Sequence, residues 1–113
     1  MNTTSKGRDA ERRVAMVLQQ KGHKIIATNW RTRWCEIDIV SQKKDCVFFT
    51  EVKFRQNNTW GSGLSYITDS KLKQMKFAAE LWLSQNKWKN ESQLVAAEVQ
   101  ETVKLFLLIF KPF

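Results

Sequence analysis

Two apolar segments on either side of a short polar stretch constrain the fold of this chain more than any other feature. They are residues 37–40 and 47–52, and the polar residues between them are Ser41–Asp45. Apolar runs of this length around a polar loop predict a β-hairpin. We expect a register in which Ser41 pairs with Cys46.

The predicted hairpin gathers acidic side chains. Because strand side chains alternate between the two faces of a sheet, Glu36 and Asp38 share one face, as do Glu51 and Lys53. In the expected register Glu36 faces Glu51, and Asp38 faces Phe49. Like charges placed opposite each other destabilise a sheet. The carboxylates therefore form either a solvated outer face or a site that binds a cation.

The N-terminal segment predicts an amphipathic helix from about Lys6 to Lys21, which ends at Gly22. Its apolar residues follow the three-and-four spacing of a buried stripe. Glu11 lies at the edge of that stripe. It is either an ordinary acid near a helix N-terminus or a further carboxylate close to the hairpin.

The remaining segments complete an α/β pattern. We expect a strand over Lys24–Trp30, a helix from Thr68 or Asp69 to about Gln85, and strands over Gln93–Val99 and Val103–Phe110. The resulting order is α-β-β-β-α-β-β, which predicts an α/β domain with a mixed central sheet. A chain of 113 residues fits a single domain, here residues 1–113.

Basic and aromatic residues alternate around the predicted hairpin. Such residues can hold a phosphate backbone and stack on an unpaired base. The structural alternatives are equally ordinary: tryptophans also cap sheet edges, lysines are commonly exposed to solvent, and a polar loop can serve only as a connection. The candidates for nucleic-acid binding are Arg31, Arg33, Arg55, Trp60 and Lys71.

Composition limits the classes of function. The net charge of +8 and the pI near 9.8 favour an anionic partner, for which nucleic acid is the natural choice. A single histidine, His23, excludes a histidine-based zinc site. Cys35 and Cys46 are expected to be free thiols. With no long apolar run and no apolar leader in the N-terminal residues, we expect a cytoplasmic protein that does not enter a membrane.

The order of these residues resembles a known family. Asp38 followed by Glu51-Val52-Lys53 resembles the Asp…Glu-x-Lys signature of restriction-endonuclease-like nucleases. In more detail, the chain resembles the YraN-type family of endonucleases, which is itself similar to Holliday junction resolvases. The further residues that carry the resemblance are Gly7, Ala10, Glu11, Asn29, Arg31, Glu36, Ile37, Phe49, Thr50, Arg55 and Lys71.

The resemblance implies a restriction-endonuclease-like three-layer α/β core and a metal-dependent site. It implies that Asp38 and Glu51 hold Mg²⁺ or Mn²⁺, with Glu11 or Glu36 completing the acidic pocket, and that Lys53 assists the attack. It also makes a homodimer an expectation, through the apolar last strand or the tryptophan-rich loop. One departure stands out, because Cys35 replaces the glycine that family members usually place before Glu-Ile-Asp.

Three functions fit these observations. The first is a Mg²⁺-dependent endonuclease that acts on DNA, including branched or structured DNA. The second is a nucleic-acid-binding module with a vestigial nuclease site, which would bind DNA equally well in the presence of a chelator. The third is a small basic protein-interaction domain, which would show no salt-dependent affinity for DNA.

Overall fold

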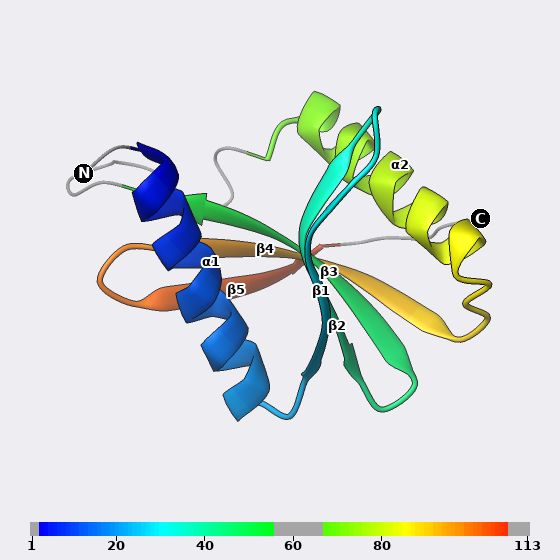
Figure 1. Cartoon of the computed structure of the whole chain (residues 1–113), viewed down its shortest axis with the longest axis horizontal. Helices are drawn as coiled ribbons and strands as arrows, with labels where there is room; N and C mark the ends of the chain where they lie inside the picture. The colour runs from blue at the N-terminus through cyan, green and yellow to red at the C-terminus, as the bar shows by residue number, and fades with distance from the viewer. Residues whose placement is uncertain (1–2, 56–66, 109–113) are drawn as a thin grey trace.

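The computed structural model describes residues 3–55 and 67–108 of the chain. In these ranges the elements follow the predicted order and lie close to the predicted bounds (Figure 1). They are α1 (Thr3–Gln20), β1 (Lys24–Arg31), β2 (Glu36–Lys43), β3 (Cys46–Phe54), α2 (Asp69–Gln85), β4 (Glu91–Val99) and β5 (Val103–Leu108). None of the helices in these ranges has the length and apolar character needed to cross a membrane.

The five strands form one mixed sheet in the order β1-β2-β3-β4-β5. Strands β3 and β4 are parallel, whereas the other three neighbouring pairs are antiparallel. Parallel neighbours require a crossover connection, since a tight turn can only reverse the chain. Helix α2 lies in that crossover, between β3 and β4.

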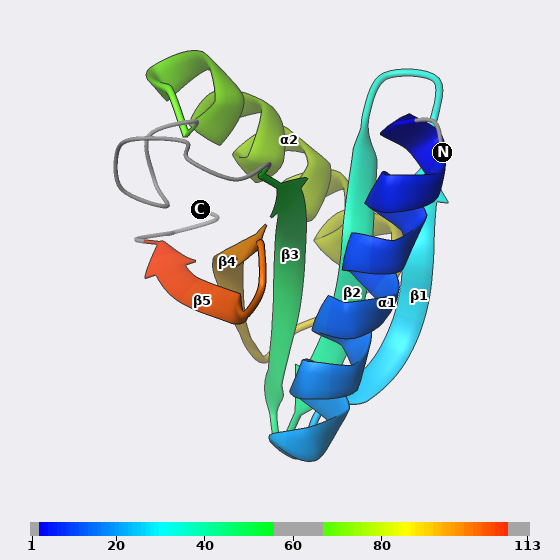
Figure 2. The same ribbon diagram turned by 90° about the vertical axis from the view of Figure 1, so that its left-hand side faces the viewer.

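The two helices cover opposite faces of the sheet, which gives the predicted three layers (Figure 2). On one face, Ala10, Val14 and Leu18 of α1 pack with β-strand residues such as Ile39. On the other face, Ala78, Ala79, Trp82 and Leu83 of α2 pack with a second set that includes Phe49. Because successive side chains of a strand point to opposite faces, each strand contributes to both cores.

The register between β2 and β3 differs from the prediction. The strands extend to Lys43 and Cys46, which pair with each other, so the turn contains only Lys44 and Asp45. Lys44 adopts a positive φ of 55°, as tight hairpin turns require. The expected pairing of Ser41 with Cys46 is therefore wrong by two residues. In the observed register Phe49 pairs with Val40, so Asp38 does not face Phe49.

The sheet is irregular beside its acidic residues. Ile37 packs in the α2 core and Ile39 in the α1 core, although a regular strand would direct both to one face. The backbone pairing of β2 with β3 extends only as far as Ile39 and Thr50. The strand therefore changes the face to which its side chains point at Asp38, where the regular backbone pairing with β3 has ended.

Candidate active site

An open pocket of about 380 Å³ is lined by the N-terminal half of α1, by β2 and the C-terminal part of β3, and by Lys71 in the first turn of α2. Carboxylates from α1, β2 and β3 reach it, as do lysines from β3 and α2. The predicted catalytic and metal residues therefore lie together, and they are joined by Lys71. The charged residues that line the pocket are Glu11, Glu36, Asp38, Glu51, Lys53 and Lys71.

Asp38 is the most strongly perturbed acid of the pocket. Its Oδ2 accepts a hydrogen bond of 2.7 Å from the backbone N–H of Val52. Burial, followed by the charge of Glu51, a hydrogen bond to the Glu51 side chain and the charge of Glu11, raises the pKa of Asp38 to about 8, although the Val52 N–H opposes the shift. In the absence of a cation, Asp38 therefore keeps its proton near neutral pH, beside the Glu51 side chain to which it is hydrogen-bonded.

Glu51 is held from the opposite side of the pocket. The ammonium of Lys71 forms an ion pair with Glu51 Oε1. The Glu51 side chain is 18% exposed and the Lys71 side chain 36% exposed, so the pair lies at the pocket wall rather than in open solvent. Lys71 was expected to bind a phosphate, and in this structure it first neutralises a candidate metal ligand.

Glu11 is positioned by a residue that the sequence did not single out for the site. Asn29 Nδ2 donates a hydrogen bond of 3.2 Å to Glu11 Oε1. Asn29 lies within β1 at a positive φ of 51°, a conformation that asparagine tolerates better than most residues. The sequence did contain one indication of a special role for Asn29: asparagine is unfavourable in strands, and this one lies inside a segment that otherwise predicts a strand.

Two further predicted residues stand at the pocket rim. Glu36 accepts a hydrogen bond of 3.0 Å from Arg31, and both side chains are more than half exposed. Lys53 is exposed at the end of β3 and lines the pocket. Both remain free to approach a bound ligand, since neither is buried.

Two further candidates for nucleic-acid binding, Arg33 and Arg55, are not among the residues that line the acidic pocket. Arg33 lies in the loop between β1 and β2, with its guanidinium carbon 5.2 Å from the centre of the Trp34 ring. Arg55 lies 3.7 Å from Glu98, and its side chain is only 9% exposed, so a phosphate would have to compete with this ion pair. Trp60 lies outside the described residues.

The donor set fits a hard divalent cation that keeps most of its water. Within the described ranges, no three His, Cys, Asp or Glu side chains are grouped so that they hold a metal ion by themselves. Mg²⁺ is commonly bound through only one or two carboxylates, with water and substrate phosphate completing its shell. The adjacent carboxylates of Asp38 and Glu51, in a pocket with room for water, meet that requirement.

The fold and the pocket define a mixed α/β domain with an acidic pocket at one end of its sheet. Comparison with known proteins assigns the family. Residues 10–104 match the uncharacterised protein family UPF0102. The chain therefore belongs to this family, which is the YraN-type family that the sequence motifs resemble.

Individual relatives support the assignment over most of the chain. A UPF0102 protein of Pseudomonas fluorescens strain Pf0-1 is 38% identical over 85 residues, which cover 74% of this chain and 71% of the relative. A UPF0102 protein of Vibrio parahaemolyticus is 32% identical over 84 residues, covering 74% and 69% of the two chains. One from Cytophaga hutchinsonii is 33% identical over 88 residues, covering 78% of each.

Proposed function

We propose that the protein is a metal-dependent endonuclease that hydrolyses phosphodiester bonds in DNA. The observation that carries the proposal is the contact between two acids, Asp38 and Glu51, in a pocket that two lysines also line. A largely buried acid that keeps its proton near neutral pH beside a second carboxylate is a costly arrangement for a structural role alone. The proximity of the two acids is explained if a cation replaces the proton of Asp38.

Asp38 and Glu51 would hold the cation, and Mg²⁺ or Mn²⁺ bound there would activate water and neutralise charge on the phosphate. Lys53 donates hydrogen bonds to a phosphate oxygen or orients the attacking water. Glu11, fixed by Asn29, adds negative charge to the pocket and accepts a hydrogen bond from water. Lys71 holds the Glu51 carboxylate in place until the phosphate arrives.

DNA is proposed as the substrate on the basis of charge. The chain carries a net charge of +8, and Lys53 of β3 and Lys71 of α2 line the acidic pocket. Phosphate groups attract such a surface without regard to base sequence. The resemblance to junction-cleaving nucleases adds branched DNA to the substrates that need testing.

One observation favours a second candidate, a nucleic-acid-binding module with a vestigial site. Glu51 is already neutralised by Lys71, and Asp38 by a proton, so the pocket is balanced without a cation. Such a module would bind DNA with the same affinity in Mg²⁺ and in EDTA. The endonuclease, by contrast, should yield cleaved DNA in Mg²⁺ and none in EDTA.

The test is cleavage of labelled linear, single-stranded and four-way-junction DNA in Mg²⁺, Mn²⁺ or EDTA. The wild type is compared with Glu51→Ala, Lys53→Ala and a matched control, Lys104→Ala, which removes an exposed lysine of β5 outside the pocket. We expect metal-dependent cutting by the wild type and the control, and a loss of at least about 100-fold in the other two variants. Binding without cutting on every substrate would support the vestigial module instead.

A further inference from the structure

A second pocket adjoins the acidic pocket and shares part of its lining. Its volume is about 370 Å³. One wall is the β1–β2 loop, residues 32–35, and the other is α2, which contributes Gln74 and Met75. Glu51 and Lys71 line both pockets, so a ligand in the second pocket lies directly beside the acidic one.

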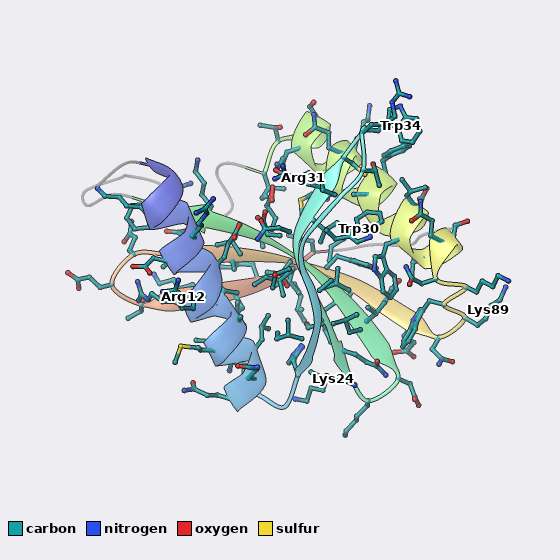
Figure 3. The ribbon with its side chains drawn as sticks, viewed as in Figure 1. Arg12, Lys24, Trp30, Arg31, Trp34 and Lys89 are labelled. Atoms are coloured by element: carbon teal, nitrogen blue, oxygen red, sulfur yellow. The ribbon has the colours of Figure 1, made fainter. Side chains whose placement is uncertain are left out.

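Trp34 stands at the outer tip of the β1–β2 loop and points away from the sheet (Figure 3). Its residue surface is 68% exposed, even though the Arg33 guanidinium lies against the ring. By contrast, Trp30 packs against the α2 core. A tryptophan that contributes so little to the core leaves a large flat apolar surface in water, and such rings are enriched where proteins bind partners.

The loop that carries Trp34 is closed by hydrogen bonds among its own residues. Backbone N–H groups of Trp34 and Cys35 both donate to Thr32 Oγ1, at 3.1 and 3.3 Å. The Thr32 N–H donates to the Cys35 carbonyl at 2.8 Å. A ring presented by a fixed loop loses little further freedom on binding.

Cys35 is not among the described residues with a positive φ, so its backbone does not require the family's glycine.

The charged groups that line the second pocket neutralise one another. Arg31 bonds to Glu36 at 3.0 Å, and Lys71 pairs with Glu51. A lining whose charges are already paired suits an uncharged planar group better than a phosphate. The Gln74 amide offers one donor group and one acceptor for the edge of such a group.

We propose that the second pocket binds one unpaired nucleobase, next to the phosphate that the acidic pocket hydrolyses. Trp34 stacks on the base, as aromatic side chains do in proteins that bind single strands. This inference rests on the proposed function and narrows its substrate class to DNA with an unpaired nucleotide beside the scissile phosphate. A fully paired duplex binds less well because a base must first leave the stack.

The test uses DNA that contains 2-aminopurine, an adenine analogue whose fluorescence is quenched when it stacks. Two duplexes of identical length are titrated in EDTA, one fully paired and one with a single-nucleotide gap that leaves the analogue unpaired. We expect the wild type to quench the unpaired analogue and to bind the gapped duplex about 10-fold more tightly, within the contribution of one stacked base. Equal affinity for the two duplexes would overturn the inference, as would binding to neither.

Three variants assign the effect to the ring. Trp34→Ala should reduce the preference to less than about twofold, whereas Trp34→Phe should keep at least about threefold, since a smaller ring still stacks. Phe77→Ala removes an aromatic residue that is 51% exposed on α2 but does not line the pocket, and it should behave as the wild type. Unchanged preference in Trp34→Ala would refute the assignment, provided that the variants melt within a few degrees of each other.

The same proteins assayed with Mg²⁺ separate this inference from the proposed function. Metal-dependent cutting of paired and gapped DNA at equal rates would overturn the base pocket and leave the endonuclease intact. Quenching and the gap preference without cutting on any substrate would overturn the endonuclease. The base-binding pocket would then belong to a binding module.

Discussion

Asp38 sits at the point where the strand changes face, and its acid–base behaviour follows from that position. A regular strand would offer a backbone carbonyl to the Val52 N–H, but here the Asp38 side chain accepts that hydrogen bond. The geometry directs its carboxyl group inwards, towards Glu51 and Glu11. The cost of this arrangement should be measurable as a dependence of stability on pH.

The pKa of Asp38 is about 8 in the folded protein, against an ordinary value of 3.8. The folded state therefore binds more protons than the unfolded chain between these values, and its stability falls as the pH rises through that range. Between pH 5.5 and 8.5, without metal, we expect the wild type to lose about 3 kcal/mol relative to Asp38→Asn. Urea denaturation at the two pH values measures this difference.

Asp38→Asn is a suitable reference because the amide oxygen still accepts from Val52 and the amide group carries no charge. Parallel pH profiles for the wild type and Asp38→Asn would show that the carboxyl group ionises normally. In that case Asp38 would not keep its proton beside Glu51, and its pKa would give no support to a cation at this site.

Asn29 supports Glu11 through a strained backbone conformation and a hydrogen bond. A side chain with a Cβ and no local hydrogen bond is unfavourable at positive φ by about 1–2 kcal/mol. Asn29→Ala should therefore lower the free energy of unfolding by about 1–2 kcal/mol. Asn29→Gly, which loses the same hydrogen bond but tolerates the conformation, should lose less. A larger loss for glycine than for alanine in urea denaturation would contradict the assigned strain.

At the scale of the elements, helix α2 connects the site to the fold. The Thr68 hydroxyl accepts from the Lys71 N–H and caps the helix. This cap fixes the first turn, from which Lys71 reaches Glu51. The helix itself is anchored by Ala78, Ala79, Trp82 and Leu83 against the sheet.

Removing the Lys71 charge should therefore lower the stability of the protein, because Glu51 loses its partner. Lys71→Met should destabilise the protein at pH 8 by about 1 kcal/mol, because Glu51 is left partly buried beside Asp38 without a cation. Lys73→Met removes an exposed lysine from the same helix and should change stability by less than about 0.5 kcal/mol. Equal effects of the two substitutions in urea denaturation would show that the Lys71–Glu51 pair contributes nothing specific.

Much of the element order was predictable because both helices and the apolar strands have clear periodicity. The Gly22 and Thr68 signals placed the end of α1 and the start of α2 within a residue or two. The hairpin register was not predictable, because Ser41 and Gln42 are polar but belong to the strand, where Ser41 is fully buried and contacts His23. The register depended on where the turn falls, which composition alone does not decide.

The candidate site was predictable in its acids but not in their connections. Motif order brought Glu11, Asp38 and Glu51 together, and the structure places them in one pocket. Asn29 and Lys71 belong to the sequence motif, but their pairing with Glu11 and Glu51 depends on tertiary contacts between elements, which the sequence does not specify. The burial of Arg55 against Glu98 likewise arises from the pairing of β3 with β4.

At the scale of the whole molecule, charge should govern how the protein meets its partner. The net charge of +8 predicts that DNA affinity falls steeply with salt, because each phosphate contact releases counterions. For about four contacts, affinity should fall about 100-fold between about 50 and 200 mM salt. Fluorescence anisotropy in EDTA measures this slope. An affinity that does not change with salt would favour a protein partner.

The proposed endonuclease requires both Asp38 and Glu51, because these two acids would hold the divalent cation. Single-turnover cleavage of gapped and four-way-junction DNA by the wild type and by Asp38→Asn/Glu51→Gln, purified in parallel, tests it most directly. We predict cutting by the wild type only with a divalent cation, and a rate at least about 100-fold lower for the double variant. Equal rates for the two proteins, or no cutting by the wild type under any condition, would show that Asp38 and Glu51 do not form a metal-dependent endonuclease site.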